Sequence, residues 1–293
     1  MNSFPLAAGR FPRGLVARWA RHASLTAGWR ALVGLCATCL LSGWASAGTG
    51  EPRLAQPGDL SLAVSVVGSD STITAHEPVT VRVEITNRAT EDLTLRLASD
   101  LTTQVEVFDA KRTLVAATPK MNLPLHTLFL SPRLAAGAVN VQFLVVSGLY
   151  DFARPGAYSI RVKQLELSRE MQVLAEGAAS LGVLPFNQAR LEARCAEILR
   201  SVQRGPSGAS ALPFHTGVTA LYSVRHDAVL PCLDWLAREW TDRYAVLAMR
   251  RIGTERAMKL VNALAARKDR VGEEARRGLK MRLEPSFWDI EGE

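Results

Sequence analysis

Apolar and polar residues alternate through much of the chain between residues 60 and 184, which predicts β-strands. In the clearest run Val79, Val81, Val83 and Ile85 alternate with polar residues, as expected for a strand with one buried face. Turn residues separate several such runs, and no helical period interrupts them. Strands are expected within residues 60–67, 79–86, 93–97, 105–107, 127–130, 139–143, 158–162 and 178–184. This spacing predicts an antiparallel β-sandwich over residues 60–185.

The period of the apolar residues changes after Asn187, which predicts an all-α domain over residues 186–293. Asn187 and Asp227 stand where N-cap residues are expected, and Asp242, Gly253-Thr254 and Asp269 separate the later helices. Helices are expected within residues 187–203, 220–224, 228–240, 244–252, 256–266 and 271–283. The chain is therefore expected to be a two-domain protein, all-β and then all-α.

The predicted helices are similar to one another. A shift of 28 positions places Ala220 on Ala248 and Leu233 on Val261, and a further shift of 27 places Ala248 on Ala275. A period near 30 with paired helices resembles short HEAT-like repeats, in which alanines allow helices to approach and leucines fill the seam. The alternative is an ordinary small helical bundle with chance self-similarity.

Two segments of the strand-rich region resemble bacterial immunoglobulin-like domains. One is His76-Glu77-Pro78-Val79, followed by an alternating strand that ends at Asn87. The other is Leu149–Tyr158, where a Pro-Gly turn leads into a strand whose first aromatic residue is a tyrosine. The resemblance implies an immunoglobulin-like fold, and folds of this kind carry many functions.

Residues 1–47 have the pattern of a secretory signal peptide. They contain five arginines and no acidic residue, then the apolar run Ala31–Leu41 and the small-residue site Ala45-Ser46-Ala47. The apolar run is shorter than the roughly 20 residues that span a bilayer. We expect cleavage after Ala47, a flexible lead-in over residues 48–59, and export to the periplasm or the cell exterior. The alternative is a leader that stays attached as an anchor.

The positive charge of the chain is concentrated in this leader. The formal net charge is +7, and the five leader arginines account for most of it. The high isoelectric point is therefore weak evidence for nucleic-acid binding. We expect no nucleic-acid partner, and membrane contact only through a retained leader.

The sequence contains no recognisable catalytic, cofactor or metal-binding motif. His76, His126, His215 and His226 are scattered without the spacing of metal ligands. The segment Gly205–Ala209 lacks the final glycine of a nucleophile motif and is interpreted as a linker. We therefore expect no cofactor and no metal, and binding rather than catalysis.

Only Cys195 and Cys232 remain outside the leader. In an oxidising compartment they are a candidate disulfide. Closing that loop would stabilise the fold by roughly 3.5–4 kcal/mol in the chain-entropy model. The alternative is two buried thiols on neighbouring helices.

Arginines and tryptophans gather on two successive predicted helices, a composition common at protein interfaces. The candidate partner-binding residues are Arg238, Trp240, Arg243, Arg250 and Arg251. The alternative is that the tryptophans belong to the core and the arginines face solvent. The expected function is an exported, non-catalytic binding or assembly module for a protein of the cell envelope. The alternative function is an envelope enzyme or enzyme inhibitor that uses a loop over residues 117–137.

Overall fold

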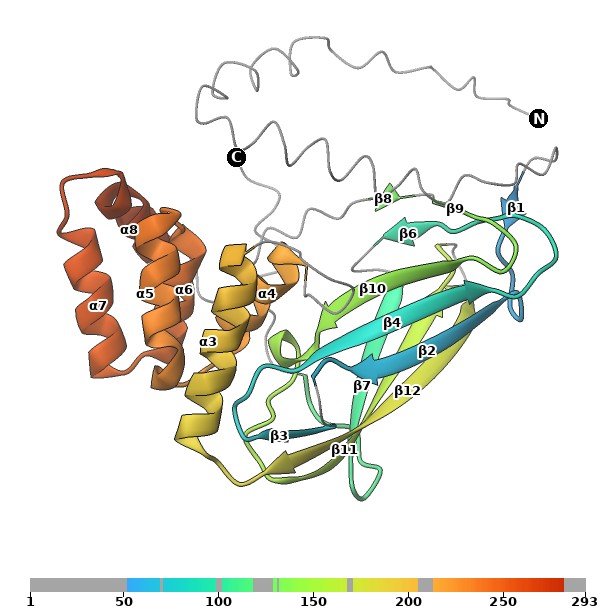
Figure 1. The fold of residues 1–293 in the computed structure, drawn as a ribbon, viewed down its shortest axis with the longest axis horizontal. Helices are drawn as coiled ribbons and strands as arrows, with labels where there is room; N and C mark the ends of the chain where they lie inside the picture. The colour runs from blue at the N-terminus through green and yellow to red at the C-terminus, as the bar shows by residue number, and fades with distance from the viewer. Residues whose placement is uncertain are drawn as a thin grey trace, which may run out of the picture. The chain divides into compact units, whose positions relative to one another are not determined.

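Strands precede residue 185 and α-helices follow it in the described residues of the computed structural model (Figure 1), with one short 3-10 helix, η1 (Val146–Gly148), among the strands. The predicted signal peptide and most of the 117–137 loop lie outside the residues that the structure describes. The described residues are 52–68, 71–98, 102–117, 129–130, 132–167, 171–204 and 213–281.

Two larger sheets and two small ones contain the strands of the described residues. The first larger sheet has the antiparallel order β10-β4-β2, and the second has the order β3-β12-β11-β7, in which only the β3–β12 pair is parallel. Their strands are β2 (Leu60–Val66), β3 (Thr72–Thr74), β4 (Thr80–Asn87), β7 (Thr103–Asp109), β10 (Val139–Val145), β11 (Gly156–Leu165) and β12 (Val173–Leu184). The small sheets contain β1 (Arg53–Leu54), β5 (Leu93–Thr94) and β9 (Arg133–Leu134), and β6 (Leu97–Ala98) with β8 (Phe129–Leu130).

Part of the predicted lead-in is paired rather than free. β1 runs parallel to β5, and the Arg53 guanidinium lies 2.6 Å from the Asp59 carboxylate and 2.5 Å from the Glu91 carboxylate. These contacts fix residues 53–59 against the strands.

Both larger sheets contribute to one hydrophobic core. The predicted alternation of β4 is confirmed, because Val79, Val81, Val83 and Ile85 are all buried. From the other sheet Ile160 and Val162 enter the same core. At Gly177 in β12, an added Cβ would lie 2.7 Å from the Leu62 carbonyl oxygen, so the absence of a side chain lets β2 and β12 come this close.

In β10, Val139, Val141 and Phe143 alternate with Asn140 and Gln142, which predicts that the apolar set faces the sheet core, and this prediction is wrong. In the register with β4, Asn140 and Gln142 lie opposite the buried Ile85 and Val83 and so share their face. Leu144 shares that face, opposite the buried Val81, whereas Val139, Val141, Phe143 and Val145 face the other way. Val139 and Val141 are 50% and 40% exposed, while Phe143 and Val145 pack against the helices.

Within the part of the chain that the structure describes, six α-helices and a short 3-10 helix follow the sheets. They are α3 (Gln188–Arg204), α4 (Phe214–Ser223), η2 (Asp227–Val229), α5 (Leu230–Glu239), α6 (Arg243–Ile252), α7 (Glu255–Ala265) and α8 (Arg270–Lys280). The predicted cap Asn187 accepts a backbone N–H bond in the first turn of α3, and Asp242, Thr254 and Asp269, which are predicted to separate the later helices, do the same for α6, α7 and α8. Asp227 is not a cap as predicted, because the His226 ring accepts the Ala228 N–H bond in its place.

The helices pack as consecutive neighbours, α3 with α4, α5 with α6 and α7 with α8 (Figure 1). The three alanines that the sequence shifts superpose, Ala220, Ala248 and Ala275, are all buried. Helices α6 and α8 come closest at Gly278, where an added Cβ would lie 2.8 Å from the Arg243 carbonyl oxygen. No helix within the described ranges is long and apolar enough to cross a membrane.

The helices contact the sheets through polar groups as well as through Phe143 and Val145. The Ser147 and Ser223 hydroxyls are 2.7 Å apart. Arg190 of α3 donates to the Thr72 carbonyl at 2.5 Å and lies 3.4 Å from the buried Glu77 carboxylate. The strand-rich and helical parts therefore share a bonded boundary.

Candidate binding surface of the helical segment

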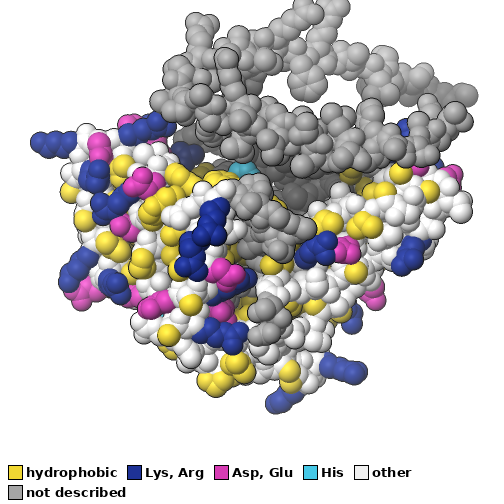
Figure 2. All heavy atoms as spheres, in the orientation of Figure 1, with side chains coloured by type: hydrophobic (Ala, Val, Ile, Leu, Met, Phe, Trp, Pro, Cys, Tyr) yellow, Lys and Arg dark blue, Asp and Glu magenta, His cyan; other side chains and the backbone are white. Residues whose placement is uncertain are grey.

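The predicted partner-binding residues lie in different environments and do not form one patch. The Arg238 guanidinium pairs with Asp234 on its own helix at 2.8 Å, and Arg243 lies over the Tyr244 ring. Trp240 packs in the aromatic group of the helical core, 4.7 Å from Phe214 by ring centroids. On the face in Figure 2, basic and acidic side chains are interspersed over the helical segment rather than separated.

Arg250 has a structural position at the end of α8. Its Nη1 donates to the carbonyl oxygens of Gly278 and Met281 at 2.9 and 2.7 Å. Helix C-termini leave carbonyls without intrahelical partners, and a guanidinium satisfies them while opposing the negative end of the helix dipole. Arg250 therefore stabilises the end of α8 and is not free for a partner.

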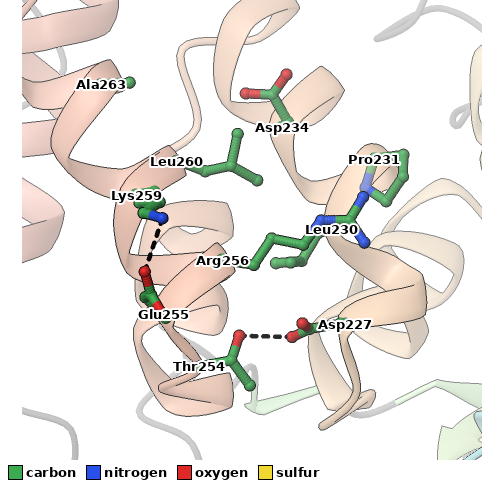
Figure 3. Close-up of a pocket in the computed structure, with 10 residues that line it drawn as sticks. All are labelled: Asp227, Leu230, Pro231, Asp234, Thr254, Glu255, Arg256, Lys259, Leu260 and Ala263. Carbon is green, nitrogen blue, oxygen red and sulfur yellow. Dashed lines mark hydrogen bonds and ion pairs between the residues drawn. The ribbon is translucent and has the colours of Figure 1, made fainter.

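A groove of about 780 Å³ runs between α5 and α7 (Figure 3). Its apolar lining comes from Leu230, Pro231, Leu260 and Ala263. Arg256 extends from α7 across this groove toward Pro231 (Figure 3). The groove thus combines an apolar lining with a cation.

Charged residues line the edges of the groove, and most are already paired. Lys259 pairs with Glu255 at 2.7 Å, and the Thr254 hydroxyl donates to Asp227 at 2.6 Å (Figure 3). No hydrogen bond or ion pair links Arg256 to any residue within the described ranges. Arg256 is therefore the cation in the groove that is open to a ligand.

A second pocket of about 390 Å³ adjoins the groove and shares Asp227, Thr254 and Arg256 with it. Arg225 and His226 also line this pocket. Sequence reasoning places Arg256 in the arginine-rich region of the helices but misses Arg225 and the groove itself, because the lining comes from separate turns and helices and carries no local motif.

Three rings meet beside the second pocket. The His226 ring centroid lies 4.7 Å from that of Phe186 and 5.7 Å from that of His76. His76 belongs to the turn between β3 and β4, while Phe186 lies between the last strand and α3. Burial lowers the pKa of His76; the nearby Asp151 carboxylate opposes this and His226 adds to it. The ring group therefore favours an uncharged His76 at the boundary of sheets and helices.

Two thiols and one tyrosine hydroxyl are buried in the helical core. Cys195 and Cys232 are free thiols, so the predicted disulfide is not formed in the structure. Burial raises the pKa of Cys232 to about 11 and also raises that of Cys195, which leaves both as inert thiols near neutral pH. The Tyr222 hydroxyl donates to Asp242, and burial raises the pKa of Tyr222. Among the residues that the structure describes, no three acidic, histidine or cysteine side chains are grouped to hold a metal ion.

No family model and no curated protein matches this chain. Solved structures with partial likeness include the CARDB domain of the Pyrococcus furiosus protein PF1109, with 12% identity and a TM-score of 0.25 over 44% of this chain and 94% of that one. Another is the Pseudomonas fluorescens alkylpurine DNA glycosylase AlkC, with 13% identity and a TM-score of 0.26 over 43% of this chain and 30% of that one. The bacterial hydrophobin BslA has 14% identity and a TM-score of 0.22 over 44% of this chain and 98% of its own. Likeness at this level does not indicate a function.

Proposed function

We propose that this chain is an exported, non-catalytic binding module that holds a segment of an envelope protein between α5 and α7. The observation that carries the proposal is the open groove with its apolar lining and the uncompensated Arg256 across it. A segment with both apolar and acidic side chains complements these features. The thiols and the Tyr222 hydroxyl are buried away from this groove, which favours binding over chemistry there.

The fold proposed for this module is an immunoglobulin-like sandwich followed by HEAT-like helices. The sandwich is supported by the shared core of the two larger sheets and by Tyr158, whose hydroxyl donates to the Arg154 carbonyl at 2.9 Å beside the Pro-Gly turn. The HEAT-like assignment is supported by the sequence shifts near 28 positions and by the burial of the matched alanines. HEAT-like helices commonly present extended binding surfaces, which agrees with a groove between successive units.

Ala263 offers a direct test of the groove. It is exposed and lines the groove, while its neighbour Asn262 is exposed on the same helix and does not line it. Ala263→Arg places a long cation in the groove, and Asn262→Arg adds the same charge outside it. Cross-linking capture from the envelope fraction should recover a partner with the native protein and with Asn262→Arg, and lose it with Ala263→Arg. Equal capture by both variants would exclude the groove as the binding site.

Export is tested at the N-terminus. The protein purified from its native envelope fraction should begin near Gly48 by mass spectrometry, since cleavage is proposed after Ala47. A chain that still carries residues 1–47 would favour a retained anchor instead.

A further inference from the structure

Three arginines near the second pocket have no acidic partner within the described ranges. Arg225 lies in the turn between α4 and η2, Arg251 lies near the end of α6, and Arg256 lies near the start of α7. Elsewhere in the described ranges some arginines are paired, for example Arg53 with Asp59 and Glu91, and others such as Arg96 and Arg200 are not, but these line neither pocket. The distinct feature of this end of the groove is that Arg225 and Arg256, both without an acidic partner among the described residues, line the same pocket.

Two of these cations, Arg225 and Arg251, are close enough for the charge of one to act on the other. Burial is the main cause that lowers the pKa of Arg251 to about 10, and the charge of Arg225 lowers it further. The second pocket has one acidic residue in its lining, Asp227, and this carboxylate accepts the Thr254 hydroxyl bond. Two positive charges thus remain in excess among Arg225, Asp227, Arg251 and Arg256. A bound anion would reduce their mutual repulsion.

We infer that the second pocket, with Arg251 beside it, binds the carboxylate side chains of an acidic segment of the protein partner. Guanidinium groups bind carboxylates through two parallel hydrogen bonds, which gives direction as well as charge. The pocket is continuous with the apolar groove through Thr254 and Arg256, so one extended segment can occupy both. Small inorganic anions would contact the arginines but would leave the apolar groove unoccupied. This inference rests on the proposed function, because it assigns the chemistry of the segment that the groove holds.

The test uses labelled hexaglutamate as the probe, with hexaglutamine as its uncharged counterpart, and fluorescence anisotropy of the full chain at about 0.1 M salt. Hexaglutamate should bind and hexaglutamine should not. Arg225→Gln/Arg251→Gln/Arg256→Gln should weaken hexaglutamate binding about tenfold or more, since each lost charge-assisted contact lowers the affinity several-fold. Arg225→Gln/Arg256→Gln changes exposed residues only and should give a smaller loss in a protein with unchanged melting temperature.

The matched control is Arg96→Gln/Arg200→Gln/Arg204→Gln, which removes the same charge from three exposed arginines outside the pocket. It should bind hexaglutamate within about twofold of the native protein, because long-range attraction is screened over about 10 Å at 0.1 M salt. Equal weakening in both triple variants would overturn the inference and leave only net charge as the cause. Displacement by inorganic phosphate, but not by acetate at equal ionic strength, would also overturn it and assign the pocket to phosphate.

Failure of the inference differs from failure of the proposed function. If hexaglutamate does not bind, the acidic segment is excluded, while partner capture by Asn262→Arg but not by Ala263→Arg still supports the groove. If capture is independent of Ala263 but the hexaglutamate results hold, the pocket binds carboxylates and the groove is not part of its site.

Discussion

Arg250 is an arginine with a structural role at the end of α8. Its guanidinium satisfies two carbonyl oxygens at the end of α8, those of Gly278 and Met281. We predict that Arg250→Ala lowers the free energy of unfolding by about 1.5–3 kcal/mol, the range for hydrogen bonds to charged groups. The measurement is urea unfolding followed by circular dichroism.

Arg238→Ala is the control for this prediction. Arg238 pairs with Asp234 on the surface of its own helix, and such exposed pairs contribute roughly 0.3–0.5 kcal/mol. If the two variants lose similar stability, Arg250 does not have the structural role assigned to it. The same reasoning shows that charge reversal at Arg250 would disturb α8 and could not report on partner binding alone.

His76 makes stability depend on pH in a defined direction. Burial keeps its pKa in the folded chain below the ordinary value of 6.5. The unfolded chain therefore binds this proton more readily, and His76 contributes stability that is present above about pH 6.5 and lost as the pH falls below it. Arg190 and Glu77 lie in the same boundary region. The predicted pH dependence of the unfolding free energy concerns the His76 ring alone.

His76→Asn should make this pH dependence shallower. His76 has a left-handed backbone with a φ of 69°, and asparagine tolerates that conformation better than most residues. We predict that the unfolding free energy of the native chain falls more between about pH 7.5 and 5.5 than that of the variant. An identical slope in both proteins would show that His76 is not the titrating group.

At the scale of elements, the sequence predicts where strands and helices lie better than it predicts which of their faces are buried. Alternation marks β10 correctly as a strand, but alternation alone does not say which set faces the sheet core. The helices decide this, because Phe143 and Val145 pack against them and turn the polar Asn140 and Gln142 to the other face. That contact joins residues distant in sequence and has no local signal.

Gly278 tests the close packing of α6 and α8. In most exposed helix positions Gly→Ala is stabilising by roughly 1 kcal/mol. At Gly278 the added Cβ would meet the Arg243 carbonyl oxygen at 2.8 Å and the Val246 Cβ at 3.0 Å, so the helices would have to move apart. We predict that Gly278→Ala destabilises the chain by about 1–3 kcal/mol, as other overpacked sites do.

Thermal unfolding of Gly278→Ala and the native protein measures this effect. Gly217→Ala serves for comparison, because its added Cβ would meet a side-chain methyl of Val202 at 2.7 Å rather than backbone. Gly217→Ala should therefore lower the melting temperature less than Gly278→Ala does. A stabilised Gly278→Ala would mean that α6 and α8 are farther apart than described.

The candidate site was predicted less well than the elements, for a geometric reason. Arg250 and Arg251 are adjacent in sequence, but successive helix residues point about 100° apart, so one caps α8 and the other is influenced by Arg225. Arg225 and Arg256 line one pocket, and Arg251 is close enough to Arg225 to be affected by its charge, although the three come from separate helices and turns. The sequence shows that these three residues are charged, but their spacing does not show that they lie near one another in the fold.

At the scale of the whole molecule, Arg190 links the helices to the sheets. It is the cation beside the Glu77 carboxylate, which is 4% exposed and also accepts the Thr74 N–H bond. Removing the cation leaves a buried carboxylate with fewer partners, a change that is strongly destabilising in proteins. Because the bonds of Arg190 cross from α3 to the strands, their loss should weaken the coupling between the two parts as well as the stability of each.

We predict that Arg190→Ala lowers the free energy of unfolding by about 2–4 kcal/mol, below the largest losses at fully buried pairs because the arginine side chain is partly exposed. Calorimetry should also show a broader transition, or two transitions, as the strands and helices unfold with less cooperativity. Arg200→Ala on the same helix removes an exposed arginine and should leave the single transition unchanged. If Arg190→Ala unfolds in one transition at the native temperature, the boundary is held by the apolar contacts of Phe143 and Val145 with the helical core, and Arg190 is dispensable.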